Sequence, residues 1–284
     1  MASTNPPSAA SHHEQTPKKH TFVSLAKALG RPLLGTVLTV PSSLVASLAA
    51  QSFDWVMIDM EHSPLSPAIM TEMVQGVSSS SHGSCLPVVR VPGHGVEWIK
   101  WALDSGASGI IVPMVNNASE ARQIIDRAIY PPGGNRSFGP FHAPFGSGDP
   151  TGGWAAYYQR ARGRGIAVLP IIESAEGVQN VDEILSLDEV TGVFIGPYDL
   201  RLSLGLPGGV DGPEPEFIAA VDSICEAGRK HGKVVGSMAT TPELVRTRTD
   251  AGMKFLLTTL DYSILASGFA ASRATSDEAL GRSE

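Results

Sequence analysis

Val168-Leu169-Pro170-Ile171-Ile172-Glu173-Ser174 is a short apolar run that ends on a carboxylate, and Val193-Phe194-Ile195-Gly196-Pro197-Tyr198-Asp199 repeats this pattern one unit later. Short apolar runs of this kind are typical of strands that are buried on both faces of a parallel sheet. A carboxylate at the end of a buried strand is costly unless it is paired or binds a metal. The two units therefore predict neighbouring parallel strands whose carboxylates, Glu173 and Asp199, lie side by side at the strand C-termini.

Strand-like runs alternate with helix-like stretches along most of the chain. The expected strands are Leu33–Leu38, Phe53–Asp59, Pro87–Val91, Gly109–Pro113, Ile166–Ile172, Gly192–Ile195, Lys233–Ser237 and Phe255–Thr259. The expected helices are Ser42–Gln51, Ser66–Ser78, Val96–Ser105, Ala118–Ala128, Val178–Ser186, Glu214–His231 and Pro242–Ala251. This alternation predicts an α/β fold of the (β/α)8 TIM barrel type. A doubly wound open sheet is the competing fold, but Gly35–Val40 is not the Gly-rich dinucleotide turn that this fold would require.

Composition excludes several classes of function. The 284 residues carry a net charge of −7 without a basic stripe, so nucleic acid is not an expected partner. No apolar run approaches the length of a membrane span. The two cysteines, Cys85 and Cys225, have no metal-ligand spacing, which favours a reduced cytoplasmic chain in which both are packing residues.

The two ends of the chain differ in composition from its middle. We expect residues 1–22 to be a disordered, Pro/Ser-rich tail, because polar segments of this kind do not bury enough apolar surface to fold. Residues 23–273 form the barrel domain in this interpretation. Residues 274–284 are expected to be a loose C-terminal tail.

The two strand-end carboxylates fit a divalent metal. Both are hard oxygen ligands, and a pair of them leaves room for water and a bidentate substrate on a six-coordinate ion. This arrangement suits Mg2+ or Mn2+. The alternative for Glu173 or Asp199 taken singly is a helix cap or an ion pair with arginine.

Three further side chains are candidates for the same site. Arg90 ends a predicted strand, where it can bind a carboxylate or enolate oxygen or form a buried salt bridge. His62 lies close to Asp59 and Glu61 and is a candidate general base. Asp104 lies at the end of a predicted helix, near the start of the next strand, and its residue pattern alone indicates a turn aspartate.

The lysine positions and one long connection bear on the reaction type and on the site. No lysine lies at the C-terminal end of a predicted strand, so a Schiff base is not expected and carbanion chemistry next to a carbonyl would need a metal. The connection Pro131–Gly146 is unusually long for a compact domain. Because long connections are usually functional, we expect this one to lie over the barrel mouth.

Taken together, the segments resemble the HpcH/HpaI-type class II pyruvate aldolases of the citrate-lyase-like superfamily, over about residues 35–260. The motifs that carry the resemblance are Phe53–Trp55, Ile58–His62, Val89–Pro92, Leu103–Ala107, Val112–Val115, Tyr130–Arg136, Ile172–Glu173 and Gly192–Leu200. The resemblance implies a phosphoenolpyruvate/pyruvate-type barrel. It also implies that the last helix is exchanged with a neighbour in a homo-oligomer, a trimer or a hexamer.

The resemblance assigns roles to residues of this chain. It implies a divalent ion (Mg2+, Mn2+ or Co2+) on Glu173 and Asp199, and a 2-oxo acid, pyruvate or oxaloacetate, that reacts as its enolate with an aldehyde or another acceptor. Arg90 would stabilise the enolate oxygen, and His62, oriented by Asp104, would move the proton on the aldol hydroxyl. The substrate carboxylate would be held by the main chain at Gly196, Pro197, Tyr198 and Asp199 and by the loop near Ser137.

The chain departs from the family pattern in its acceptor contacts. Bacterial aldolases of the family usually have a tryptophan near Val37 and a glutamine near Ile171, and both are missing here. Phe138 and Tyr157 resemble instead the flanking aromatic walls of the macrophomate synthase type, with Tyr158 as an alternative to Tyr157.

The main functional hypothesis is a metal-dependent carbon–carbon lyase of the aldolase type. The alternative is a macrophomate-synthase-like oxaloacetate decarboxylase or biosynthetic carbon–carbon ligase. A catalytically silent barrel with a binding role is the third hypothesis.

Overall fold

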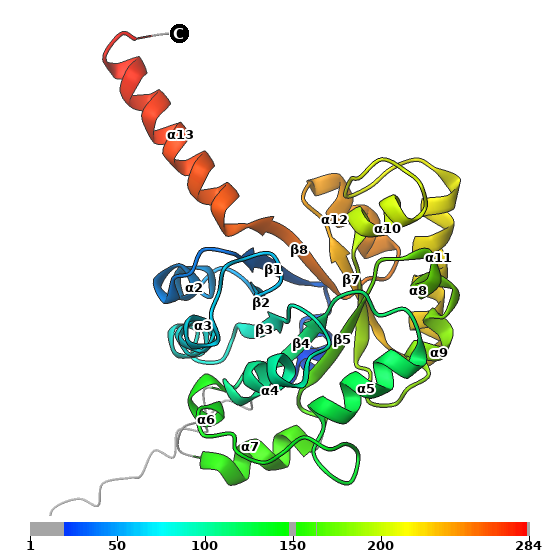
Figure 1. The fold of residues 1–284 in the computed structure, drawn as a ribbon. Coiled ribbons are helices and arrows are strands. Elements are labelled where there is room, and N and C mark those ends of the chain that lie inside the picture. The colour runs from blue at the N-terminus through cyan, green and yellow to red at the C-terminus, as the bar shows by residue number, and fades with distance from the viewer. Residues whose placement is uncertain (1–19, 148–151, 163, 283–284) are drawn as a thin grey trace, which may run out of the picture.

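Eight parallel strands close into a barrel in chain order in the computed structural model, which describes residues 20–147, 152–162 and 164–282 (Figure 1). The strands are β1 Leu33–Leu38, β2 Trp55–Asp59, β3 Leu86–Arg90, β4 Gly109–Val112, β5 Ala167–Ile172, β6 Gly192–Ile195, β7 Val234–Met238 and β8 Phe255–Leu260. The predicted TIM barrel is confirmed, and no predicted strand boundary is displaced by more than two residues.

Helices surround the barrel. They are α1 Phe22–Leu29, α2 Ser43–Ala49, α3 Pro67–Ser80, α4 Val96–Asp104, α5 Ala118–Ala128, α6 Ala143–Gly146, α7 Gly153–Arg162, α8 Ala175–Gln179, α9 Val181–Leu185, α10 Pro197–Ser203, α11 Pro215–His231, α12 Pro242–Asp250 and α13 Asp261–Ala279. The single helix expected over Val178–Ser186 is replaced by α8 and α9, which meet at Asn180. No helix was expected at α10.

Aromatic packing closes the N-terminal end of the barrel. Phe22 of α1 meets the rings of Trp55 and Phe255 edge to face, with centroid distances of 5.7 and 5.0 Å. Gly35 makes this packing possible, because a Cβ at that position would lie 2.5 Å from the Trp55 indole. Since α1 covers this end, the C-terminal end of the strands is the one left open for a site.

The long connection Pro131–Gly146 does not lie over the barrel mouth as expected. Helix α5 follows β4 and carries the chain back, so the connection begins at the N-terminal end of the barrel. There the Gly146 carbonyl accepts a hydrogen bond from Ser78, in the last turn of α3. Gly106, after α4, is close enough to this segment that an added Cβ would lie 2.5 Å from the Ala143 carbonyl oxygen.

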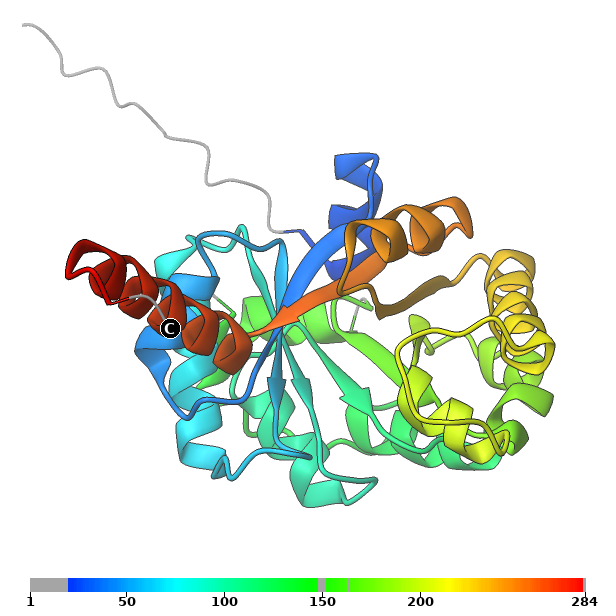
Figure 2. The same cartoon turned by 90° about the horizontal axis from the view of Figure 1, so that it is seen from above.

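The predicted tails at the two ends of the chain are covered only in part by the described residues. Most of the predicted N-terminal tail, residues 1–19, falls outside the described residues. Helix α13 continues to Ala279, past residue 274 where a loose tail was expected, and projects from the barrel (Figures 1 and 2). Across the described ranges, no helix is both long enough and apolar enough to cross a membrane.

Candidate active site

A cavity of about 380 Å3 lies at the C-terminal end of the strands. Its charged and histidine residues come from β2, β3 and the segments that follow β2, β5 and β6. The cavity brings together the following residues predicted for the site: His62, Arg90, Glu173, Gly196, Pro197, Tyr198 and Asp199. Residues that are far apart in the sequence therefore line the same cavity.

Glu173 is a buried carboxylate directly after β5, with 6% of its surface exposed. Its Oε1 accepts a 2.7 Å hydrogen bond from the backbone N–H of Met114, which follows β4. Met114 adopts a left-handed conformation with φ of 51°. The pKa of Glu173 is raised to about 7, chiefly by burial and also by the nearby Glu61 and Asp199 carboxylates, against the lowering effects of the Met114 hydrogen bond and of Arg90. An ionised Glu173 is thus unfavourable here unless a cation is present.

Gly196 lets the end of β6 approach this carboxylate. A Cβ at Gly196 would lie 2.4 Å from Oε2 of Glu173, closer than two atoms can approach without displacement. The chain then enters α10 with Pro197 in its first turn, and Asp199 follows as an exposed acid in the same turn. The sequence Gly-Pro-Tyr-Asp thus places the Asp199 carboxylate in the same cavity as Glu173.

Arg90 and Asp59 form a buried ion pair across the ends of β3 and β2. Arg90 donates from Nε to Oδ1 of Asp59 at 2.8 Å and from Nη2 to Oδ2 at 2.7 Å. Burial opposes the charge of Arg90 most strongly, but the hydrogen bonds to Asp59 together with the negative charges of Asp59, Glu61 and Glu173 outweigh it, so the pKa of Arg90 is raised. Asp59, which is 1% exposed, also accepts the backbone amides of Glu61 and His62 at 3.0 and 3.3 Å. Arg90 thus forms the expected buried salt bridge and also lines the cavity, whereas its binding of a carboxylate or enolate oxygen stays a prediction.

His62 stands at the rim of the cavity with 66% of its side chain exposed. Its Nε2 lies 3.7 Å from Oε2 of Glu61, which is too long for a hydrogen bond. Burial raises the pKa of Glu61, against the lowering effect of Arg90. No carboxylate within the described chain fixes the His62 ring as Asp104 was expected to do.

Asp104 and the predicted aromatic walls lie elsewhere in this chain. Asp104 ends α4, on the return to the N-terminal end of the barrel, and accepts a 2.6 Å hydrogen bond from Arg136. Tyr157 is buried and donates a 2.8 Å hydrogen bond to the Leu103 carbonyl. Phe138 packs on Tyr158 at a ring distance of 5.7 Å. These residues and the exposed Ser137 do not line the cavity of their own chain, and their predicted roles stay predictions.

Asp261, which was not among the residues predicted for the site, supports the rim of the cavity. Asp261 follows β8 and is buried, and it accepts hydrogen bonds from the amide and hydroxyl of Thr39 at 2.9 and 2.7 Å and from the amide of Val40 at 2.8 Å. It thereby ties the segment after β1 to the start of α13. The signal was present, because an apolar strand that ends on an acid is the same pattern that identified Glu173.

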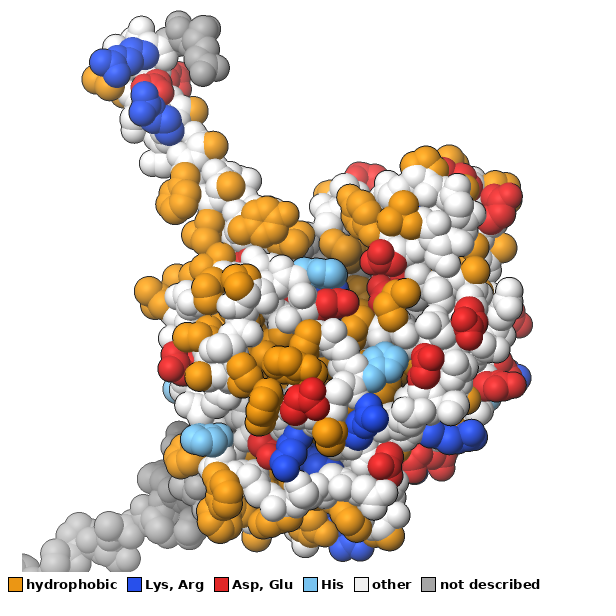
Figure 3. Space-filling model, in the orientation of Figure 1, with side chains coloured by type: hydrophobic (Ala, Val, Ile, Leu, Met, Phe, Trp, Pro, Cys, Tyr) orange, Lys and Arg blue, Asp and Glu red, His pale blue; other side chains and the backbone are white. Residues whose placement is uncertain are grey.

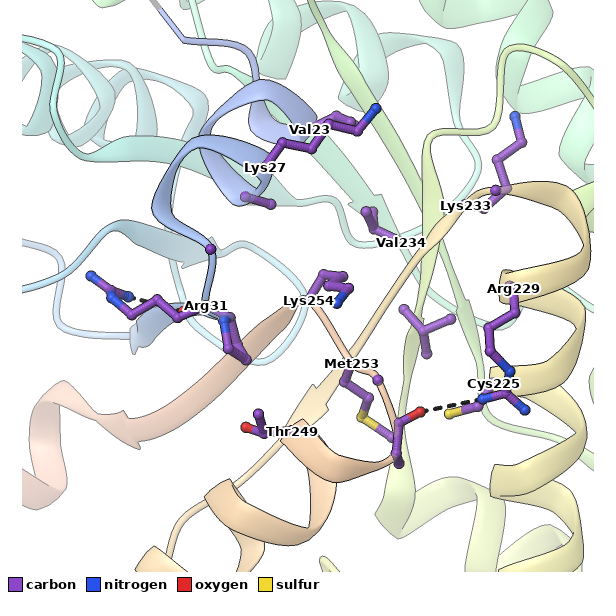
Figure 4. A pocket seen from close by; sticks show the side chains of 18 residues that line it. Val23, Lys27, Arg31, Cys225, Arg229, Lys233, Val234, Thr249, Met253 and Lys254 are labelled. Atoms are coloured by element: carbon purple, nitrogen blue, oxygen red, sulfur yellow. Dashed lines mark hydrogen bonds between the residues drawn. The ribbon is translucent and has the colours of Figure 1, made fainter.

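A second cavity, of about 460 Å3, lies near α1, α11 and α12 (Figure 4). Its cations are Lys27, Arg31, Arg229, Lys233 and Lys254. Lys233 donates to three backbone carbonyls, and Arg31 is paired with Asp54. Among the described residues that line this cavity there is no Asp, Glu or His, so it offers no carboxylate or imidazole ligand for a divalent metal.

The metal ligands available at the mouth are few. In the described part of the chain no three His, Cys, Asp or Glu side chains are grouped closely enough to hold a metal ion. Glu173 and Asp199 would therefore be the protein's share of an incomplete shell, which fits an ion that keeps water and takes substrate oxygens.

Comparison with known proteins identifies the family. A sequence model described as "HpcH/HpaI aldolase/citrate lyase" matches residues 37–266. The chain belongs to this family. The resemblance carried by the strand-end motifs is thereby confirmed.

Relatives within the HpcH/HpaI family carry aldolase names. The hydroxypyruvate/pyruvate aldolase of Rhizorhabdus wittichii is 36% identical over 84% of this chain and 91% of its own length. The 4-hydroxy-2-oxo-heptane-1,7-dioate aldolase of Shigella boydii is 33% identical over 87% of this chain and 91% of its own length. Among solved structures, macrophomate synthase superimposes with a TM-score of 0.74 and 26% identity over 90% of this chain and 89% of its own.

Proposed function

We propose that this HpcH/HpaI family member is a metal-dependent aldolase, a lyase that forms or cleaves the carbon–carbon bond next to a 2-oxo acid. The observation that carries the proposal is the convergence of Glu173, Asp199 and Arg90 in one cavity at the C-terminal end of the barrel. The aldolase names of relatives at 36% and 33% identity support it.

The residues present fit a divalent metal. Glu173 is held by one backbone amide, and its pKa of about 7 reflects burial beside other carboxylates, which a cation would relieve. Gly196 leaves the space next to Oε2 that a Cβ would fill. Glu173 and Asp199 would hold Mg2+ or Mn2+, which when bound supplies a Lewis acid that polarises the 2-oxo carbonyl.

Residues of the chain would stabilise the developing charge, transfer the proton and bind the substrate carboxylate. Arg90 would donate to the oxygen on which negative charge develops, and its bidentate pairing with Asp59 fixes the guanidinium before substrate arrives. His62 would move the proton on the aldol hydroxyl. The backbone at Gly196–Asp199 would hold the substrate carboxylate.

We further propose that the working form is a homo-oligomer, a trimer or a hexamer. Asp104, at the end of α4, can reach a His62 only if that histidine belongs to a second copy of the chain. Helix α13 supports this proposal, because Tyr262, Ile264 and Phe269 are exposed on it. Figure 3 shows hydrophobic side chains along this projecting helix. The free, buried thiols of Cys85 and Cys225 support a reducing compartment, the cytoplasm.

The metal assignment is tested by Glu173→Gln and Asp199→Asn, with Glu243→Gln as a surface control. We expect both site variants to lose Mn2+ binding by calorimetry and to lose turnover of 4-hydroxy-2-oxo acids, while circular dichroism shows an intact fold. Wild-type turnover in either site variant would overturn the assignment.

A second candidate function is decarboxylation of oxaloacetate followed by carbon–carbon bond formation. The structural likeness to macrophomate synthase favours it. Incubation with oxaloacetate and either an aldehyde or a 2-pyrone separates the two candidates, because only the second predicts a pyrone adduct.

A further inference from the structure

The second cavity, near α1, α11 and α12, lies where the barrel strands begin, at the end opposite the candidate active site (Figure 4). Lys233 directly precedes β7, and Lys254 directly precedes β8. Lys27 comes from the last turn of α1, and Arg229 comes from the last turn of α11. Four separate segments therefore bring cations to one cavity of about 460 Å3.

The charge around the second cavity is opposite in sign to that of the whole protein. The chain has a net charge of −7, whereas the described lining holds five Lys or Arg side chains and no Asp or Glu. The segment before α1 adds no net negative charge, since residues 1–19 hold Glu14 against Lys18 and Lys19. Like charges around one cavity repel each other, and a bound anion would offset that repulsion.

Two of the five cations of the second cavity are committed to the fold. Arg31 donates to both carboxylate oxygens of Asp54, at 2.6 and 2.9 Å. Lys233 donates at 2.6–3.1 Å to three backbone carbonyls of the segment Leu187–Val190, which precedes β6. These two side chains contribute charge to the cavity, but their donors already serve other groups.

The other three cations keep donors for a ligand. Lys27 and Lys254 are exposed, and within the described ranges neither ammonium group has a hydrogen-bond or ion-pair partner. Arg229 donates from Nη1 to the Ala251 carbonyl at 3.4 Å, the contact dashed in Figure 4. Cations in the last turn of a helix also compensate the helix dipole, which accounts for Lys27 and Arg229 in part. It does not account for Lys254, which follows no helical turn directly.

The walls between these cations are open because helices end there on glycine. Gly30 and Gly232 are the C-caps of α1 and α11, and Gly252 lies just after α12. All three have a left-handed backbone, with φ of 63°, 63° and 89°, and a Cβ on any of them would meet no atom within 4 Å. The volume of about 460 Å3 is in the usual range for small-molecule sites and exceeds what a single oxyanion fills.

We propose that the second cavity binds a small organic phosphate, with the phosphate group held by Lys27, Arg229 and Lys254. A phosphate monoester carries about −1.5 to −2 charges at pH 7 and three strong acceptor oxygens. Charge-assisted hydrogen bonds from two ammonium groups and a guanidinium match those oxygens. The organic part of the ligand would occupy the volume beside the three glycines. Binding there involves no covalent step and is separate from the reaction at the barrel mouth.

Calorimetry with glucose 1-phosphate tests the site on the full chain, in EDTA so that no metal at the barrel mouth binds the phosphate. We expect glucose 1-phosphate to bind more tightly than inorganic phosphate, and glucose not to bind. The double variant Lys27→Gln, Lys254→Gln should weaken the binding of glucose 1-phosphate at least about tenfold. Equal affinity for inorganic phosphate would overturn the organic ligand, and wild-type affinity in the double variant would overturn the site.

The matched control is the double variant Lys100→Gln, Arg122→Gln, which removes the same charge from outside the cavity lining. We expect it to keep the wild-type affinity for glucose 1-phosphate. Equal weakening in both double variants would show an effect of net charge alone and would reject a site at the second cavity.

Pyridoxal 5′-phosphate locates the site on the unaltered chain, whether or not the variants fold. Its aldehyde condenses with a lysine amine with loss of water, and borohydride reduces the imine to a stable amine. We expect peptide mass spectrometry to find that glucose 1-phosphate protects Lys27 and Lys254 from labelling but not Lys100. Uniform protection, or none, would contradict the proposal. Neither measurement uses turnover, so the outcome is independent of the proposed aldolase function.

Discussion

Arg90 has a structural role at the barrel mouth in addition to the chemical role that we propose for it. Its partner Asp59 is almost completely buried, and three hydrogen-bond donors besides Nη2 of Arg90 converge on this carboxylate. Removal of Arg90 would leave a buried charge without its cation. A loss of activity on substitution is therefore not by itself evidence of a catalytic role.

Arg90→Ala is expected to lower the free energy of unfolding by about 3–5 kcal/mol, because it strands the Asp59 carboxylate. Urea unfolding measures this change. The double variant Asp59→Asn, Arg90→Gln removes both charges and should recover much of the loss while remaining inactive. Wild-type stability of Arg90→Ala would show that the ion pair is not needed for the fold.

Glu173 is expected to make the metal-free protein less stable as pH rises. Its pKa is about 7 in the fold against 4.5 ordinarily, so between these values the folded state binds more protons than the unfolded state. Stability that is present below pH 4.5 is lost as pH rises through 7, by on the order of 3 kcal/mol. We expect Glu173→Gln to remove this part of the pH dependence in urea unfolding with EDTA. Identical pH profiles of wild type and variant would contradict the raised pKa.

At the scale of elements, the site depends on how closely the end of β6 approaches the end of β5. Gly196→Ala would push a methyl group into Glu173, 2.4 Å from Oε2. We expect Mn2+ affinity to fall at least about tenfold by calorimetry, since displaced ligands bind weakly. Gly93→Ala is the matched control because a Cβ there meets no atom within 4 Å. Equal affinity in the two variants would show that Glu173 is not a ligand.

The elements also show what the sequence could and could not predict. Apolar strand runs identified the barrel and its C-terminal ends, because the strands are buried on both faces and their acids end the runs. The connection Pro131–Gly146 was misplaced, because length alone does not indicate to which end of the barrel α5 returns the chain. Asp261 carried the same signal as Glu173, but its partners at Thr39 and Val40 are over 200 residues away.

At the scale of the whole molecule, α13 is the feature that a single chain does not explain. Asp261 is its one buried residue within the part that the structure describes, and Phe269 is 72% exposed. A helix with so much exposed apolar surface usually packs against another protein surface. The positions of Asp104 and Ser137, away from the cavity of their own chain, also support the proposed homo-oligomer.

We expect Phe269→Asp to dissociate the proposed homo-oligomer, because it would place a charge in the apolar contact that we propose between α13 and another copy. Ser272→Asp, an exposed polar position on the same helix, is the control. Sedimentation velocity should give the oligomer for the control and a smaller species for Phe269→Asp. A wild-type protein that sediments as a monomer would exclude the proposed assembly.

The proposed aldolase function requires enolate formation from a 2-oxo acid in the presence of metal. Exchange of the pyruvate methyl protons in D2O, followed by NMR, measures this step without any acceptor. Protein stripped with EDTA should show no exchange, and addition of Mg2+ or Mn2+ should restore exchange in the wild type but not in Asp199→Asn. Absence of exchange from folded protein that binds metal would contradict the account.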